Sequence, residues 1–425
     1  MTFSHTAEIL PERVQQRDYR TQRKETPIKN IKALPPFWGI VPLFMLAHFS
    51  HHLMTALPVP LTPFIREYFS LSYTQSGLVV SAFTLSYGIA QLPSGWLADR
   101  LGPRTMMTIA ISGVALVGFF IGITKSYIAL IALLVLMGIV GGGYHPSAPP
   151  MIARLVNPSL RGRAIGLHMG SGSVAYFLAP LIGAAIATSM GWHSSFILLA
   201  IPTFILGIIL YILLGRIGDI NNSGKLSSTS STEEVKDTSW LGLSPHLAIF
   251  IILSTFTQAV ILSVVAFIPL FMTDHFGVDA KTAALSLALL YSAGIWASPL
   301  GGYLSDRLGS VKVVISVCFL AGPAIVLLAS MPYGFFLALF LLILGTIVFV
   351  RAPASVAYIV DRAPEKNRST ILGIYHFSSQ ESGGVLTPVM GYFIGKLGFF
   401  PSFAIAGIFV LIVTLICSLL LLRIR

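Results

Sequence analysis

The chain has 425 residues, of which only 10% are charged and 55% are hydrophobic. Soluble domains carry roughly 25% charged residues, so this chain has too few charged side chains to cover a surface in water. The same composition excludes disordered, collagen-like and disulfide-rich secreted proteins, and it indicates an integral membrane protein.

The net charge of +11 comes from basic residues in short clusters between long apolar stretches. Clusters placed in this way fit lipid headgroups better than nucleic acid. The two cysteines, Cys318 and Cys417, lie in separate apolar stretches. We therefore expect neither a disulfide framework nor a cysteine metal site.

The chain divides into four segments. Residues 1–36 are polar and basic without an apolar core, which predicts a cytoplasmic tail and not a signal peptide. Residues 37–215 and 244–425 contain six apolar stretches each, and a membrane-spanning helix needs about 20 such residues. Residues 216–243 are rich in Ser and Thr and predict a flexible cytoplasmic linker. The fold expected is all-α, with twelve transmembrane helices in two six-helix bundles.

The basic residues predict the orientation. The tail, the linker, the C-terminus and the connections on the same side hold 22 of the 27 basic residues. The opposite side holds Arg66, Lys125, Lys281 and Lys396. Because basic residues stay on the cytoplasmic side, both termini are predicted to be cytoplasmic in a multi-pass protein of the plasma membrane.

The two halves repeat each other. GWLADRLG at residues 95–102 recurs as GYLSDRLG at residues 302–309, at an offset of 207. The same offset pairs His51 with Gln258, and an offset of 208 pairs His168 with His376. A six-helix unit used twice in one orientation is typical of carriers that work by alternating access.

The segments GWLADRLGPR (95–104) and GYLSDRLGSVK (302–312) resemble the signature loop of the major facilitator superfamily, and the resemblance extends over the whole chain. It implies secondary active transport, with no enzymatic reaction and no cofactor. Three stretches, Phe49-Ser-His51, Phe69-Ser-Leu-Ser with Gln75-Ser-Gly77, and Gly143-Tyr-His-Pro146, are similar to the branch that contains fosmidomycin-resistance exporters, which implies proton-coupled efflux. The wider group of drug exporters also has a Gly-rich pattern in helix 5 that implies antiport, and here Ala replaces several of its glycines. The Arg that many such exporters carry in helix 4 is missing, so no mechanism that needs it is carried over.

The signature segments predict a conformational latch on the cytoplasmic side. Glycine in each segment permits close helix approach, and the following aspartate can cap a helix or pair with an arginine of a neighbouring helix. The predicted latch consists of Gly95, Asp99, Arg100, Arg104, Gly302, Asp306 and Arg307. A plain positive-inside loop would explain the arginines but not the repeated spacing.

Two ionisable residues lie near the middle of predicted spans. Glu381 is the acid and Arg351 is the base, and their similar depth lets them meet. Ionisable groups at such depth are costly and mostly functional. We expect Glu381 to carry a proton while Arg351 holds either Glu381 or an anionic substrate. The alternative is a static pair that fixes helix packing.

Histidines and aromatic residues supply the remaining candidates. His48, His51 and His52 share one face of the first span, and His51 and His52 are predicted to contact substrate or proton. We expect no metal site, because no second cluster of ligands is evident in the sequence. The predicted substrate-binding residues are Arg351, His51, Gln258, Tyr144, His145, Tyr291, Trp296 and His376.

The function expected is proton-coupled export of a drug or small organic anion by a monomer that binds no nucleic acid. An importer or facilitator of a metabolite or inorganic anion is the alternative within transport. A non-transporting membrane receptor is the alternative from another class.

Overall fold

The computed structural model describes residues 37–157, 160–217, 243–364 and 367–423, which form fifteen helices and no strand. The N-terminal half contains α1 (Phe37–Thr55), α2 (Thr62–Phe69), α3 (Tyr73–Leu101), α4 (Pro103–Ile121), α5 (Tyr127–Gly141), α6 (Tyr144–Leu155), α7 (Arg161–Met190) and α8 (Trp192–Arg216). The C-terminal half contains α9 (Pro245–Phe276), α10 (Ala280–Ser292), α11 (Gly294–Leu308), α12 (Ser310–Ser330), α13 (Phe335–Arg362), α14 (Arg368–Leu397) and α15 (Phe399–Arg423). The predicted all-α fold is confirmed. The predicted tail, residues 1–36, lies outside the described residues, as does most of the predicted linker.

The twelve predicted spans are present as helical rods, and three of them are interrupted. The first rod is divided into α1 and α2, where Pro58 and Pro60 lack the amide hydrogens that would continue α1. The fourth is divided into α5 and α6 at Gly142 and Gly143, and the eighth into α10 and α11 at Ala293. The interruptions fall within the predicted spans and leave their number unchanged.

Nine helical stretches in the described part of the chain are long and apolar enough to cross a membrane by length and composition alone. Three of the twelve rods do not meet these criteria of length and composition: the rod formed by α1 and α2, and the helices α3 and α14. α1 carries three histidines, and α3 packs along α14 across the boundary between the halves. Since they face protein over much of their length, they need not be apolar on every side.

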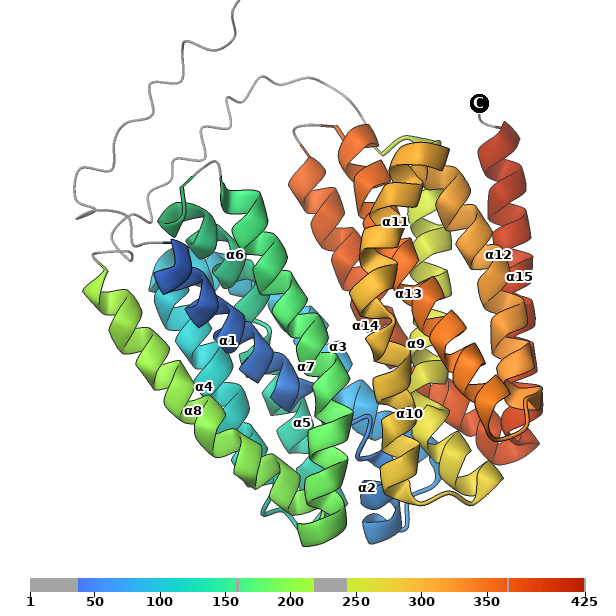
Figure 1. Cartoon of the computed structure of the whole chain (residues 1–425), viewed down its shortest axis with the longest axis horizontal. Helices are drawn as coiled ribbons and strands as arrows, with labels where there is room; N and C mark the ends of the chain where they lie inside the picture. Colours follow the sequence, from blue (N-terminus) through green and yellow to red (C-terminus); the bar gives the residue numbers. More distant parts are fainter. Residues whose placement is uncertain (1–36, 158–159, 218–242, 365–366, 424–425) are drawn as a thin grey trace, which may run out of the picture.

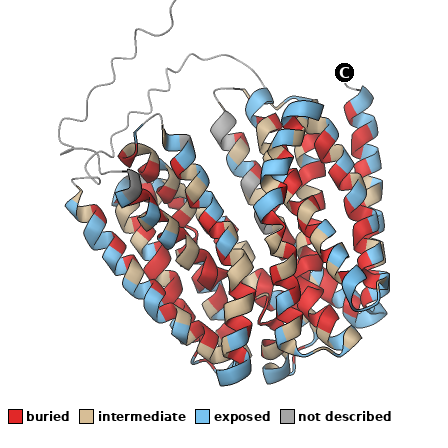
Figure 2. Cartoon of the chain, viewed as in Figure 1, coloured by how far each residue is buried: buried red, intermediate tan, exposed pale blue. Residues whose placement is uncertain are grey.

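Burial separates two kinds of apolar side chain (Figure 2). Phe44, Phe196 and Phe403 are fully buried inside the bundles. Other large apolar residues point outward, among them Ile128 at 79% exposure and Phe335 at 76%. Contiguous apolar surface of this extent is the surface that lipid covers.

The two halves are in contact toward one end of the molecule and diverge toward the other (Figure 1). The start of α1, the end of α8, the start of α9 and the end of α15 all point toward the upper side of Figure 1, and we call this side the linker end. At the opposite end, the far end, the Ser81 hydroxyl donates to the Gly384 carbonyl across 2.6 Å. A Cβ on Gly77 would lie 2.9 Å from the Thr387 carbonyl oxygen, so α3 and α14 approach here backbone to backbone. From this seam the helices of the two halves diverge toward the linker end (Figure 1).

Candidate functional site

A buried guanidinium is the main polar feature of the C-terminal half. Arg351 on α13 is 2% exposed. Its terminal nitrogens donate to the Ser254 carbonyl (3.0 Å) and hydroxyl, to the Tyr375 hydroxyl (3.2 Å) and to Gln258 Oε1 (2.7 Å). The Ser254 hydroxyl also lies 2.8 Å from that of Ser355. Helices α9, α13 and α14 thus converge on one cation.

All of these contacts of Arg351 are neutral. No described acid forms an ion pair with it, and its Nε has no hydrogen-bond partner among the described residues. The side chains of Glu381 and His376 lie outside the described part of the chain, so the predicted pair of Glu381 with Arg351 stays a prediction. A buried cation held by neutral groups retains its attraction for an anion, because hydrogen bonds solvate the charge without cancelling it.

A histidine cluster is the corresponding feature of the N-terminal half. Three histidine rings contact the ring of His48 on α1. They belong to His52 on α1, His145 on α6 and His168 on α7. His48 Nδ1 donates to the His168 carbonyl at 2.7 Å, and His168 Nδ1 donates to the Phe44 carbonyl at 3.2 Å. Since a carbonyl only accepts, these bonds place the ring proton of both histidines on Nδ1. The Nε2 lone pairs of His48 and His168 are buried and have no partner in the described part.

His51 and Tyr144, both predicted to contact substrate, are fully buried beside this cluster. His51 Nε2 lies 3.2 Å from the Tyr87 hydroxyl. The Tyr144 ring stacks on His51 at 4.7 Å and on His48 at 5.4 Å. In this conformation both residues pack within the N-terminal half and present no surface to a solute.

The remaining predicted binding residues differ in their positions. Tyr291 on α10 lies 5.5 Å, between ring centroids, from Tyr176 on α7, so this contact joins the two halves. Trp296 on α11 is 45% exposed and has no ring contact with either cluster. The structure therefore brings Gln258 to Arg351 and His145 to the α1 histidines, and leaves Trp296 apart.

Among the described side chains, the predicted latch makes no contact between the halves in this conformation. A Cβ on Gly95 or Gly302 would have no neighbour within 4 Å, so the expected close approach of helices is absent. Arg100 stacks over the Trp96 ring at 3.7 Å, and Asp306 is exposed with no ion pair to a described residue. The Asp99 side chain lies outside the described part.

Arg104 and Arg307, the other latch arginines, also contact their own half. Arg104 Nε donates to the Tyr211 carbonyl at 2.8 Å, and Arg307 lies over the Tyr303 ring at 4.9 Å. In each signature segment the turn between two helices requires a glycine with positive φ. This glycine is Gly102 (φ 84°) in the first segment and Gly309 (φ 86°) in the second. Sequence reasoning assigned the motif's conformational role to Gly95 and Gly302 instead.

An ion pair connects the halves at the far end and was missed from the sequence. Arg66 on α2 pairs with Asp274 on α9, and the Tyr73 hydroxyl donates to the same carboxylate at 2.6 Å. Arg66 also lies 4.3 Å from the centroid of the Tyr73 ring. The available signal was the repeat, which pairs Asp274 with Glu67 and so marks an acid at this depth in both halves.

The halves therefore carry different polar clusters, a guanidinium in one and imidazoles in the other. Among the described residues, the ion pair that joins the halves lies at the far end. The model of the Major Facilitator Superfamily matches residues 44–388 and 247–425. The chain belongs to this superfamily. Its members are transporters and not enzymes, as the sequence predicted.

Relatives with curated names carry different substrates. A probable L-galactonate transporter of Escherichia coli K12 is 26% identical over 61% of this chain and 60% of its own length. A probable sulfoacetate transporter of Cupriavidus necator is 26% identical over 81% of this chain and 84% of its own. A multidrug resistance protein of Dickeya zeae is 25% identical over 79% and 82%. The match to the superfamily is firm, and the relatives do not single out the drug-exporter branch.

Solved structures share the fold. A bacterial homologue of the human lysosomal transporter Spinster, in an inward-facing and unoccupied conformation, superposes with a TM-score of 0.73. The superposition covers 92% of this chain and 97% of that one at 17% sequence identity. The chain is thus a multi-pass membrane protein of the superfamily, and a secondary transporter.

Proposed function

We propose that this chain is a proton-coupled transporter of small organic anions in which Arg351 binds the anion. The observation that carries the proposal is the environment of Arg351, a guanidinium 2% exposed and hydrogen-bonded to neutral groups alone among the described residues. A carboxylate or sulfonate would complete its hydrogen bonds and neutralise its charge. The names of two relatives denote solutes of this class, L-galactonate and sulfoacetate.

The anion site is tested by replacing the guanidinium. Purified protein is screened by thermal shift against organic anions, cations and neutral sugars. We expect Arg351→Ala to weaken binding of an anion at least tenfold and Arg351→Lys to recover part of it, because lysine restores the charge but not the planar fork. Arg362→Ala is the matched control, since Arg362 is an exposed arginine on the same helix. Equal losses for anionic and cationic ligands would remove the anion site.

We also propose that Glu381 carries the coupled proton. Glu381 belongs to α14, the helix that supplies Tyr375 to the Arg351 cluster. In this mechanism protonation of the Glu381 carboxylate weakens its hold on Arg351 and so shifts the equilibrium between the inward-facing and outward-facing states. Glu381→Gln in proteoliposomes is expected to abolish transport driven by a pH gradient while substrate binding persists. Asp361→Asn is the control, because Asp361 is an exposed acid at the end of α13. Undiminished gradient-driven transport by Glu381→Gln would refute the coupling role.

The direction we propose is export. The motifs at residues 49–51 and 143–146 support it, as does a multidrug resistance protein among the relatives. The second candidate is uptake or facilitated exchange of a metabolite anion, which the two anion-named relatives favour. Counterflow of a labelled anion without proton movement would select this candidate, and absence of counterflow would favour a receptor.

The proposed orientation places the linker end in the cytoplasm, because the basic residues gather there. The conformation is then inward-facing, with the far end closed toward the outside of the plasma membrane. We propose that the transporter works as a monomer, since each chain contains both halves.

A further inference from the structure

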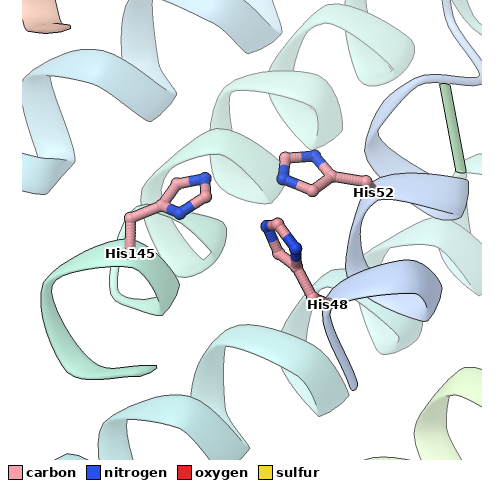
Figure 3. A group of neighbouring side chains, drawn as sticks. All are labelled: His48, His52 and His145. Atoms are coloured by element: carbon pink, nitrogen blue, oxygen red, sulfur yellow. The ribbon is translucent and has the colours of Figure 1, made fainter. Parts of the chain in front are cut away.

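We infer that His48, His52 and His145 form a binding site for a borderline divalent metal ion of the zinc class, between α1 and α6. This inference goes beyond anion transport and does not depend on it. Each of the three imidazoles offers one ligand nitrogen, and these atoms all lie within 4.8 Å of one another. Figure 3 shows the three rings converging on a common point.

The spacing within α1 suits a chelate. His48 and His52 are four residues apart in one helix, so their side chains leave the same face one turn apart. His145 approaches from α6, directly after the break between α5 and α6 at Gly142 and Gly143. Two ligands from one helix and a third from another fix three corners of a tetrahedron and leave the fourth open.

The distances permit binding with small movements. A Zn–N bond of about 2.1 Å in a tetrahedral site places ligand nitrogens roughly 3.4 Å apart. Starting from 4.8 Å or less, each nitrogen moves inward by less than about 1 Å, which side-chain rotation supplies. All three ligands are neutral imidazoles, the ligand type that zinc, nickel, cobalt and copper share and that magnesium and calcium avoid.

The surroundings of His48 are those of a metal ligand. Its Nδ1–H donates to the His168 carbonyl at 2.7 Å, so the proton is on Nδ1 and the lone pair is on Nε2, where a metal ion can bind it. That Nε2 is buried and has no hydrogen-bond partner among the described residues. A buried acceptor without a partner costs about 1–3 kcal/mol, and a bound metal ion would satisfy it.

His52 has a similar arrangement. Its Nδ1 lies 3.5 Å from the Thr55 hydroxyl, which itself donates to the His51 carbonyl at 3.1 Å. The hydroxyl oxygen can then accept a hydrogen bond from the Nδ1–H of His52, and this leaves the Nε2 lone pair of His52 free to bind a metal ion. In this inference His52 is a metal ligand instead of the proton carrier predicted from the sequence.

Gly172 on α7 makes room for both ligands. A Cβ at this position would lie 2.5 Å from His48 Cε1 and 3.1 Å from His52 Cδ2. Gly172→Ala therefore displaces two ligand rings without removing a ligand. His145 is only partly buried, and it gives the ion a route to the site.

The test is titration with Co²⁺ alone, followed by competition with Zn²⁺. The full chain is purified in detergent through a tag without histidine, freed of metal by a chelator and titrated while the visible absorption of four-coordinate Co²⁺ is recorded. We expect one Co²⁺ per chain, displaced by Zn²⁺. His48→Gln, His52→Gln and His145→Gln should each abolish the four-coordinate spectrum, and Gly172→Ala should weaken binding by about 10- to 100-fold, as loss of outer-shell support does.

His275→Gln is the matched control, because His275 is an exposed histidine at the far end of α9. Size-exclusion profiles and unfolding temperatures without metal identify a variant that fails to fold. If His48→Gln fails, His145→Gln and Gly172→Ala decide, since His145 is less buried and Gly172 is no ligand. Absence of Co²⁺ binding by the wild type, or binding that persists in folded His145→Gln and Gly172→Ala, would overturn the inference. A loss in His275→Gln equal to that in His145→Gln would also overturn it.

Discussion

Asp274→Ala is expected to open the far end of the transporter. The Asp274 carboxylate accepts from Arg66 on α2 and from the Tyr73 hydroxyl on α3 at 2.6 Å. It is the described acid that forms an ion pair between the halves, and its removal takes away both contacts at once. The side chains of Arg66 and Asp274 remain 28% and 22% exposed, so solvent screens the pair only in part.

The magnitude follows from these two contacts. An ion pair of this exposure contributes up to about 1 kcal/mol, and a hydrogen bond to a charged acceptor contributes about 1.5–3 kcal/mol. The sum of about 1.5–4 kcal/mol corresponds to a shift of roughly 10- to 700-fold in the ratio of closed to open far ends, at 1.4 kcal/mol per factor of ten. Substitution of Arg66 alone should give a smaller shift, because the Tyr73 hydrogen bond remains.

The assay is a distance distribution between spin labels on the two halves. Cysteines for labelling replace Lys125 and Lys281, which are exposed near the far end on opposite halves. We expect the wild type to show mainly the short distance and Asp274→Ala to populate a longer one. Asp279→Asn is the matched control, since this exposed carboxylate contacts only Thr282 of its own helix α10. A ratio of closed to open far ends in Asp274→Ala within twofold of the wild-type ratio would refute the reasoning.

Two further predictions concern glycines, and both are measured as unfolding temperatures in detergent. Gly345→Ala should lower the unfolding temperature, at a cost of about 1–3 kcal/mol, because the new Cβ would lie 2.1 Å from the Leu290 carbonyl oxygen. Gly373→Ala is the control and should leave the unfolding temperature unchanged, because its Cβ would have no atom within 4 Å. Equal effects of the two substitutions would contradict the packing argument. Gly309→Ala should lower the stability of the fold by about 1–2 kcal/mol, because φ is 86° at this position. Gly302→Ala is the control and should leave the stability unchanged, because Gly302 lies inside a helix and its Cβ would have no neighbour within 4 Å. An unchanged unfolding temperature for Gly309→Ala would show that the turn relaxes.

The membrane spans could be predicted from the sequence because each one requires a long apolar stretch, and that requirement is visible residue by residue. The interruption after α5 was not predicted. A run of glycines inside an apolar stretch is compatible with a continuous helix. In the structure a Cβ on Gly142 would lie 2.8 Å from Ala90 Cβ, so α3 packs closely against the chain at this break. Tertiary contact decides such a position.

The candidate site was predicted in part. Gln258 was identified because the repeat pairs it with His51, and the structure places it 2.7 Å from Arg351. Ser254 and Tyr375 complete the cluster. Ser254 is an ordinary residue within an apolar span and carries no signal of its own, whereas Tyr375 is an aromatic residue deep in a span, which is a weak signal of a pocket. The approach of His145 to His48 depends on how α1 and α6 are rotated about their axes, and periodicity within one helix does not fix a rotation relative to another.

The seam between α3 and α14 has a consequence for the speed of the transport cycle. It is built from glycines, and a Cβ on Gly384 or Gly391 would lie 2.5 Å from Thr84 Oγ1 or 2.4 Å from the Tyr73 carbonyl oxygen. Dispersion over this close contact, the hydrogen bond from Ser81 to the Gly384 carbonyl and the Asp274 cluster therefore supply the resistance to opening. Because that cluster is reached by solvent ions, whose screening length is about 8 Å at physiological ionic strength, we expect the salt concentration on one side of the membrane to set the rate at which this transporter opens toward that side.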